Sequence, residues 1–261
     1  MATDHDKLIA SPASPAPHGL PNARIPDSAG VQLKAHNNAT TDLDQVAEHG
    51  FCWVRRGFIW EQVEATPGTC DFSEYDRFMA DCTQRELHVL GCIALNNEHY
   101  GHVKDAAARA AYARYAAALA ERYKDCNIVW EIWNEPNVRT FWGWHGMHNS
   151  EPYAQEYTAL VKAAVAAMRE AVPDCTILAG AVSGMWDAPH RWMAYCFRGG
   201  ILDCGINAWS VHPYSMKCPE DYIPSYQHMR NSMIASGAPS NFPVLNSERG
   251  FPLGKKEGYA G

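Results

Sequence analysis

The sequence contains no apolar run of the roughly 18 residues that a membrane span requires, so it predicts no transmembrane helix. Basic residues are also few and never form a block: 22 Lys and Arg stand against 29 Asp and Glu, a formal charge of −7. Nucleic acids are bound by basic patches or arms, so we do not expect this chain to bind them. A neutral or small substrate fits this charge better.

Paired cysteines are missing as well. The nine cysteines include no C-x-x-C motif, and their density lies well below that of a disulfide scaffold. Cys52, Cys92 and Cys204 lie in or beside apolar segments, where a free thiol behaves as a small hydrophobic group. We expect buried, reduced thiols, with a catalytic or metal-binding cysteine as the alternative.

A glycine-rich dinucleotide-binding turn is absent too. The turn after the first predicted strand reads KAHNNATTD and has no G-x-G-x-x-G. From about residue 30, short apolar runs alternate with amphipathic segments, which predicts βα units. Such units build either a (β/α)8 barrel or a doubly wound sheet, and the missing turn favours the barrel.

The predicted strands cover residues 30–35, 52–56, 88–94, 127–133, 176–180, 206–212 and 243–248. The predicted helices cover residues 41–50, 73–86, 105–125, 151–174, 189–198 and 219–236. We therefore expect an α/β fold, a (β/α)8 TIM barrel that is incomplete because only seven strands are visible.

Length and composition fit one domain, since 261 residues with 47% hydrophobic content can bury a single large core. Residues 1–24 are rich in Pro, Ser and Ala, and we expect a flexible leader there, ahead of a barrel domain at 25–261. The leader shows neither a basic start nor an apolar h-region, so no secretion signal is visible. The compartment stays open, with the cytoplasm as the default expectation.

Polar residues gather just past the predicted strands, where the active site of a barrel lies. They are Arg55, Arg56, Asn96, Asn97, Asn134, Glu135, His212, Tyr214 and Glu248. Glu135 and Glu248 follow the fourth and seventh strands and can face each other across a barrel mouth. Glycoside hydrolysis needs such a pair, one acid to protonate the leaving oxygen and one carboxylate to attack or to activate water.

Several motifs carry a resemblance to a known group of enzymes. WNEPN at residues 133–137 and VLNSERGFP at residues 244–252 resemble the acid/base and nucleophile signatures of the clan A retaining glycoside hydrolases. SVHPY at residues 210–214, and the segment from Gly50 to Phe78, resemble family 39 and family 5 members with cellulase-like or β-xylosidase-like barrels. The resemblance runs from about residue 30 onwards.

This resemblance implies roles for single residues. It implies that Glu135 is the general acid/base and Glu248 the nucleophile, and that Arg55 steadies Glu248. It further implies that Asn134 contacts the sugar 2-hydroxyl, and that His212 and Tyr214 line the subsite where cleavage occurs. The expected reaction is hydrolysis of β-glycosidic bonds in oligo- or polysaccharides by double displacement, with the two carboxyls about 5 to 5.5 Å apart and no cofactor.

Simpler interpretations of these residues stay open. An isolated Asn-Glu-Pro is usually a solvated turn, Arg55 could form a structural ion pair, and His212 could be a core histidine. Loop tryptophans either stack on sugar rings or plug the core, and both roles are open for Trp60, Trp142, Trp144 and Trp186. Among them, we count Trp60 and Trp142 as candidate substrate-binding residues. His99, His102 and the HGMH motif at residues 145–148 have metal-like spacings but no acidic or cysteine partner beside them, so we predict no metal site there.

The sequence departs from the family after Glu248, where RGFPLGKKEGYAG follows and no eighth strand is visible. A fragment of a longer product, closure of the barrel by a partner, and a truncated relative without turnover are three explanations. The open edge could also support self-association. A smaller departure is Ser247 in place of threonine and Arg249 in place of an aromatic residue.

The rival function is a non-catalytic carbohydrate-binding protein or inactive fragment. A sugar-phosphate isomerase or aldolase is disfavoured, because this sequence lacks the phosphate site that such a barrel enzyme needs.

Overall fold

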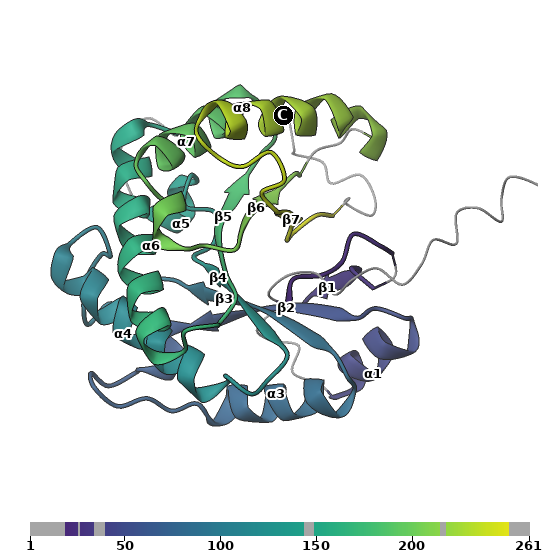
Figure 1. Ribbon diagram of the computed structural model, residues 1–261. Coiled ribbons are helices and arrows are strands. Elements are labelled where there is room, and N and C mark those ends of the chain that lie inside the picture. Colours follow the sequence, from purple (N-terminus) through teal and green to yellow (C-terminus); the bar gives the residue numbers. More distant parts are fainter. Residues whose placement is uncertain (1–18, 26, 34–39, 144–148, 215–217, 251–261) are drawn as a thin grey trace, which may run out of the picture.

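Seven parallel strands form one sheet in the order β1-β2-β3-β4-β5-β6-β7 (Figure 1). The computed structural model describes residues 19–25, 27–33, 40–143, 149–214 and 218–250. The strands are β1 Gly30–Gln32, β2 Trp53–Ile59, β3 His88–Ala94, β4 Ile128–Ile132, β5 Ile177–Ser183, β6 Ala208–His212 and β7 Val244–Asn246. Each predicted strand is therefore present, and the chain order of the strands is also their order in space.

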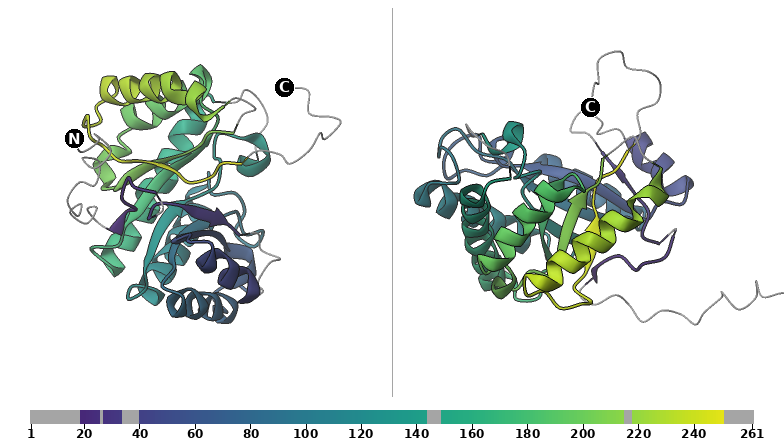
Figure 2. Two further views of the ribbon diagram at one scale, coloured as in Figure 1. Left: turned by 90° about the vertical axis from the view of Figure 1, so that its right-hand side faces the viewer. Right: turned by 90° about the horizontal axis from the view of Figure 1, so that it is seen from above.

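Helices follow the strands and lie along the outer side of the curled sheet (Figures 1 and 2). The α-helices are α1 Thr40–Glu48, α2 Trp60–Val63, α3 Ser73–Gln84, α4 Ala106–Arg122, α5 Arg139–Trp142, α6 Glu151–Ala171, α7 Asp187–Arg198 and α8 Ile223–Ala235. Two 3-10 helices are η3 Leu202–Cys204 and η4 Pro219–Tyr222. The described helices include none that is long and apolar enough to cross a bilayer.

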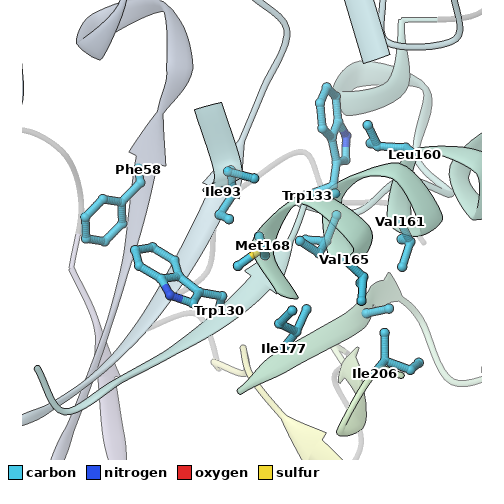
Figure 3. Close-up of a cluster of buried hydrophobic side chains, with 14 of the residues drawn as sticks. Phe58, Ile93, Trp130, Trp133, Leu160, Val161, Val165, Met168, Ile177 and Ile206 are labelled. Atoms are coloured by element: carbon cyan, nitrogen blue, oxygen red, sulfur yellow. The ribbon is translucent and has the colours of Figure 1, made fainter. Parts of the chain in front are cut away.

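Alternation along the strands sends large side chains outward to the helices. Phe58, Ile93 and Trp130 leave the sheet on that side, and Met168 of α6 lies in the same cluster (Figure 3). Trp130 is fully buried, and its ring meets Phe58 edge-on with centroids 5.1 Å apart. Truncation of such a residue to alanine typically costs about 3 to 5 kcal/mol, so this layer carries much of the stability.

A smaller apolar cluster fills the inside of the curled sheet. It consists of Leu20, Trp53, Leu90, Val129, Leu178 and Ala208. Since Leu20 is buried there, the folded domain includes at least this residue of the predicted leader at 1–24, whereas residues 1–18 lie outside the described residues. Above this apolar floor the inward positions become polar, and the candidate site is built from them.

The described sheet is an incomplete (β/α)8 barrel, because within it β1 and β7 remain the two edges. A groove of about 600 Å³ lies between β1 and β2 on one side and β7 on the other, with Gln32, Arg55, Leu245 and Glu248 among its lining residues. Self-association through this edge stays a prediction.

Candidate active site

Arg55 is the centre of the polar layer inside the barrel. It points inward from β2, is 5% exposed, and donates hydrogen bonds to Glu131, Gln32, Glu248 and Asn134. Burial lowers the pKa of its guanidinium, but the charges of Glu131 and Glu248 outweigh burial and raise the pKa above its ordinary value. Arg55 is thus a fixed cation under the mouth of the barrel.

Glu248 follows β7, and both of its oxygens have partners. Oε1 accepts a hydrogen bond of 2.6 Å from Nη1 of Arg55, and Oε2 accepts one of 2.8 Å from the Tyr214 hydroxyl. Burial and this bond to the Glu248 carboxylate raise the pKa of Tyr214, so its hydroxyl keeps its proton. Both oxygens of Glu248 are therefore held, and the orientation of its carboxylate is fixed.

Glu135 lies at the end of β4, where the backbone leaves the strand pattern. Trp133 and Glu135 have positive φ angles of 70° and 43°, and these turns keep the Trp133 ring in the outer core while Glu135 stays at the rim. Nδ1 of His212 lies 3.1 Å from Oε1 of Glu135 and 3.7 Å from Oε2 of Glu248. His212 is fully buried, so its ring approaches both carboxylates from the inside of the barrel.

The three side chains of Glu135, His212 and Glu248 form one compact group. Each contributes a nitrogen or oxygen atom, and these atoms lie within 4.8 Å of one another. Such donors could hold a divalent cation, but Nδ1 of His212 is already engaged with Glu135 and Glu248 is held by Arg55 and Tyr214. The same proximity is what a pair of carboxylates needs to act on one glycosidic bond.

Asn134 and Glu131 complete the site from β4. Oδ1 of Asn134 accepts a hydrogen bond of 2.9 Å from Arg55, and its amide N–H groups have no partner among the described residues. Glu131 is fully buried in mid-strand. Burial raises the pKa of its carboxyl, yet the Arg55 charge, with lesser contributions from His212, Ser210 and Ser247, produces a net lowering.

The sequence reasoning missed Glu131 and Gln32 as parts of the site. A signal existed for Glu131, because a charged residue in the middle of the apolar run IVWEIW must be paired if the run is buried on both faces. Gln32, on the exposed edge strand β1, offered no such signal.

Two of the predicted sugar-stacking tryptophans are core residues instead. Trp60 and Trp142 are fully buried, and their indole N–H groups donate to Glu64 and Glu156. Their predicted substrate role is wrong, because no face of either ring is open to a ligand. Trp144 lies outside the described residues.

Trp186, in contrast, is 58% exposed on the segment between β5 and α7. Its ring lies over Gly184, where a Cβ atom would collide with it. The Gly184 N–H donates to the carbonyl of His212 over 3.0 Å, so the ring stands beside the residue that contacts both carboxylates.

Other polar residues predicted at strand ends serve the framework. Arg56 points outward, where it pairs with Glu74 and stacks over the rings of Tyr75 and Phe78. Asn96 accepts a hydrogen bond from the backbone of Val103. Asn97 is fully buried and donates to the carbonyl of Glu64, which fixes the loop after β3.

The loop histidines also hold backbone in place. His99 contacts the carbonyl of Ala65 over 3.0 Å, and His102 contacts the carbonyl of Trp142. The HGMH motif at residues 145–148 lies outside the described residues. All nine cysteines are free, and burial raises the pKa of the Cys92 thiol to about 12, as expected for an inert core thiol.

A barrel that brings two glutamates together at its strand ends is the architecture of many glycoside hydrolases. Comparison with known families confirms this class: the family model described as Cellulase (glycosyl hydrolase family 5) matches residues 21–232, and the chain belongs to that family. Glu248 lies beyond the matched segment. A comparison with curated proteins found no match.

Solved structures agree on the fold. A family 39 glycoside hydrolase from Bacteroides cellulosilyticus WH2 has a TM-score of 0.68 at 19% identity, over 85% of this chain and 48% of that one. A GH39 β-xylosidase from Caulobacter crescentus has a TM-score of 0.66 at 14% identity, and the match covers 87% of this chain and 54% of the xylosidase. A GH10 endoxylanase from a sugarcane soil metagenome has a TM-score of 0.59 at 14% identity, and the match covers 84% of this chain and 66% of the endoxylanase.

The chain spans about half the length of the two family 39 proteins. These likenesses confirm the barrel fold and the predicted resemblance to families 5 and 39.

Proposed function

We propose that this chain hydrolyses β-glycosidic bonds in oligo- or polysaccharides with retention of configuration. The observation that carries the proposal is the proximity of Glu135 and Glu248, which each have a carboxylate oxygen within 4.8 Å of one on the other residue. Retaining enzymes need carboxyl groups about 5 to 5.5 Å apart, whereas inverting enzymes leave room for a water at about 6.5 to 9.5 Å. The short separation supports attack by a carboxylate over attack by water.

In the first step, a carboxylate oxygen of Glu248 attacks the anomeric carbon while Glu135 donates its proton to the leaving glycosidic oxygen. The bond to the leaving group breaks, and an ester joins the sugar to Glu248. In the second step, Glu135 takes a proton from water, and that water attacks the anomeric carbon and releases Glu248 as a carboxylate.

The surrounding side chains fit this sequence of steps. Arg55 and Tyr214 stabilise the charge that Glu248 carries before attack and regains afterwards. His212 orients Glu135 through Nδ1. Since Oδ1 of Asn134 is held by Arg55, its amide N–H groups are directed to a ligand, and we assign them to the sugar 2-hydroxyl.

The proposal is tested by trapping the ester. The protein is incubated with a panel of activated 2-deoxy-2-fluoro β-glycosides (glucose, xylose, mannose and galactose series), followed by intact mass spectrometry and peptide mapping. We expect one added sugar on the peptide that contains Glu248, and no adduct on the Glu248→Gln variant. An adduct on another residue, or rapid hydrolysis by Glu248→Gln, would contradict the assignment.

The alternative function is carbohydrate binding without turnover, and the groove beside Arg55 and Glu248 is the observation that favours it. This groove opens one side of the site to solvent, and water competes with the hydrogen bonds on which catalysis depends. Calorimetric binding of a cello- or xylo-oligosaccharide by a folded protein that forms neither adduct nor product would support this alternative.

A further inference from the structure

Glu131 occupies an unusual position for a charged residue. It lies in the middle of β4, is fully buried, and stands beneath the rim that carries Glu135 and Glu248. Its Oε2 accepts two hydrogen bonds from Arg55, one of 2.8 Å from Nε and one of 2.6 Å from Nη2. No substrate atom at the barrel mouth needs to touch it for it to affect the reaction.

The bonds of Arg55 show what Glu131 does. A guanidinium has five N–H donors in one plane. Nε and one Nη2 proton bind Glu131, the other Nη2 proton binds Asn134, and the two Nη1 protons bind Gln32 and Glu248. The two bonds to Glu131 fix the plane, so the direction of Nη1 towards Glu248 follows from them.

The charge of Arg55 also links Glu131 to Glu248. One guanidinium lies between two carboxylates, with Glu131 and Glu248 each 2.6 Å from one of its nitrogen atoms. Without Glu131, the whole positive charge would act on Glu248. A carboxylate held that tightly is a weaker nucleophile, because the ion pair must loosen when the oxygen attacks carbon.

We propose that Glu131 is a positioning residue for the reaction: it orients Arg55 towards Glu248 and takes up part of its charge, so that Glu248 is fixed without being locked. This inference rests on the proposed function of Glu248 as nucleophile. A purely structural ion pair would show itself in stability alone: its loss destabilises the protein, while the folded variant keeps its kcat.

Two variants separate orientation from charge. Glu131→Gln keeps the shape and one acceptor oxygen but removes the charge; Glu131→Asp keeps the charge but shortens the reach. The matched control is Glu74→Gln on α3, which neutralises the partner of Arg56, the neighbour of Arg55 on the outer face of β2. Each folded variant is assayed for kcat, KM and the pH profile of kcat/KM on an activated aryl β-glycoside.

For Glu131→Gln we expect kcat to fall about 10- to 100-fold with little change in KM, and the acid limb of the profile to move to lower pH by about half a unit or more. For Glu131→Asp we expect a similar fall in kcat with the acid limb in place. Glu74→Gln is expected to retain the wild-type kcat and profile. The proposal is overturned if Glu131→Gln folds and the acid limb of its pH profile does not move. If Glu131→Gln does not fold, a wild-type kcat in Glu131→Asp overturns it instead.

A second measurement does not depend on turnover. Side-chain 15N NMR of Arg55 reports rotation about its Cζ–Nη bonds, and we expect separate Nη signals in the wild-type protein that merge in Glu131→Gln but not in Glu74→Gln. If the wild-type protein shows no hydrolysis and no adduct, the proposed function fails while this spectrum still tests the orienting role. Unchanged Nη signals in Glu131→Gln contradict that role.

Discussion

The hydroxyl of Tyr214 donates a 2.8 Å hydrogen bond to Oε2 of Glu248, the oxygen that Arg55 does not hold. Tyr214 comes from the segment after β6 and Glu248 from the segment after β7, so the contact joins two neighbouring strand ends. It leaves Glu248 with one donor on each oxygen. Attack on a sugar must weaken one of these bonds. Removal of either donor should therefore change the rate of the reaction.

Removal of the Tyr214 hydroxyl is expected to slow the reaction without unfolding the protein. Hydrogen bonds to charged groups are worth about 1.5 to 3 kcal/mol, so Tyr214→Phe should lower kcat/KM about 10- to 100-fold. Initial rates on an aryl β-glycoside provide the measurement, and Tyr195→Phe on α7 is the control. Activity of Tyr214→Phe within twofold of wild type would show that the bond has no catalytic role.

The role of Glu135 as proton donor predicts a dependence on the leaving group. A good leaving group such as dinitrophenolate needs no proton, so Glu135→Ala should form the ester on Glu248 at close to the wild-type rate with it. With an unactivated alkyl or sugar leaving group, we expect a loss of about 100- to 10,000-fold. Added azide should fill the space left by the side chain and yield a β-glycosyl azide, detectable by NMR. Equal losses for both kinds of leaving group would be evidence against this role.

The positions of Glu135 and Glu248 could be predicted from the sequence because two simple rules place them. Apolar runs mark the strands of a sheet that is buried on both faces, and the residues after parallel strands meet at one end of a barrel. The structure places both glutamates at that end, with Arg55, His212 and Tyr214 in contact with them.

The sequence could not reveal which side of a strand each residue occupies. Arg55 and Arg56 are neighbours of one type, yet Arg55 points into the barrel and Arg56 out to α3, because sheet register alone decides between them. Trp60 and Trp142 were misjudged for a related reason. Both residues lie in short helices, α2 and α5, that pack against the core, and their indole N–H groups donate to Glu64 and Glu156. Whether such a segment turns its tryptophan inward or outward depends on tertiary packing, which sequence patterns do not encode.

His190 predicts an acid-sensitive contact between α7 and α8. It is 5% exposed, and neither ring nitrogen has a hydrogen-bond partner among the described residues. Burial, and then the nearby ring of His228, lower the pKa of His190 from 6.5 to about 4, while Asp187 opposes this shift. The folded protein therefore keeps His190 neutral at a pH where the unfolded chain binds a proton.

Stability from this group should be complete above about pH 6.5 and decrease as the pH falls towards 4, at most by about 1.4 kcal/mol per pH unit. His190→Phe removes the titrating group and should flatten this part of the profile, whereas His49→Gln at an exposed site should not. Urea unfolding at several pH values gives the free energies. Parallel profiles for wild type and His190→Phe would mean that His190 is solvated or paired.

Trp186 is expected to bind a sugar unit on the leaving-group side of the site. Its exposed ring lies over Gly184, whose N–H is bonded to the carbonyl of His212, and His212 contacts Glu135, the proposed donor to the leaving group. Stacking of an aromatic ring on a ligand is worth about 1 kcal/mol or somewhat more, so Trp186→Ala should raise KM for a β-linked oligosaccharide about 5- to 10-fold.

A β-glycosyl fluoride serves as the internal control for Trp186→Ala. It has no sugar on the leaving-group side that could stack on the ring, so its KM should not change. If both substrates lose the same factor, the substitution has disturbed the site as a whole; if neither changes, no sugar stacks on Trp186.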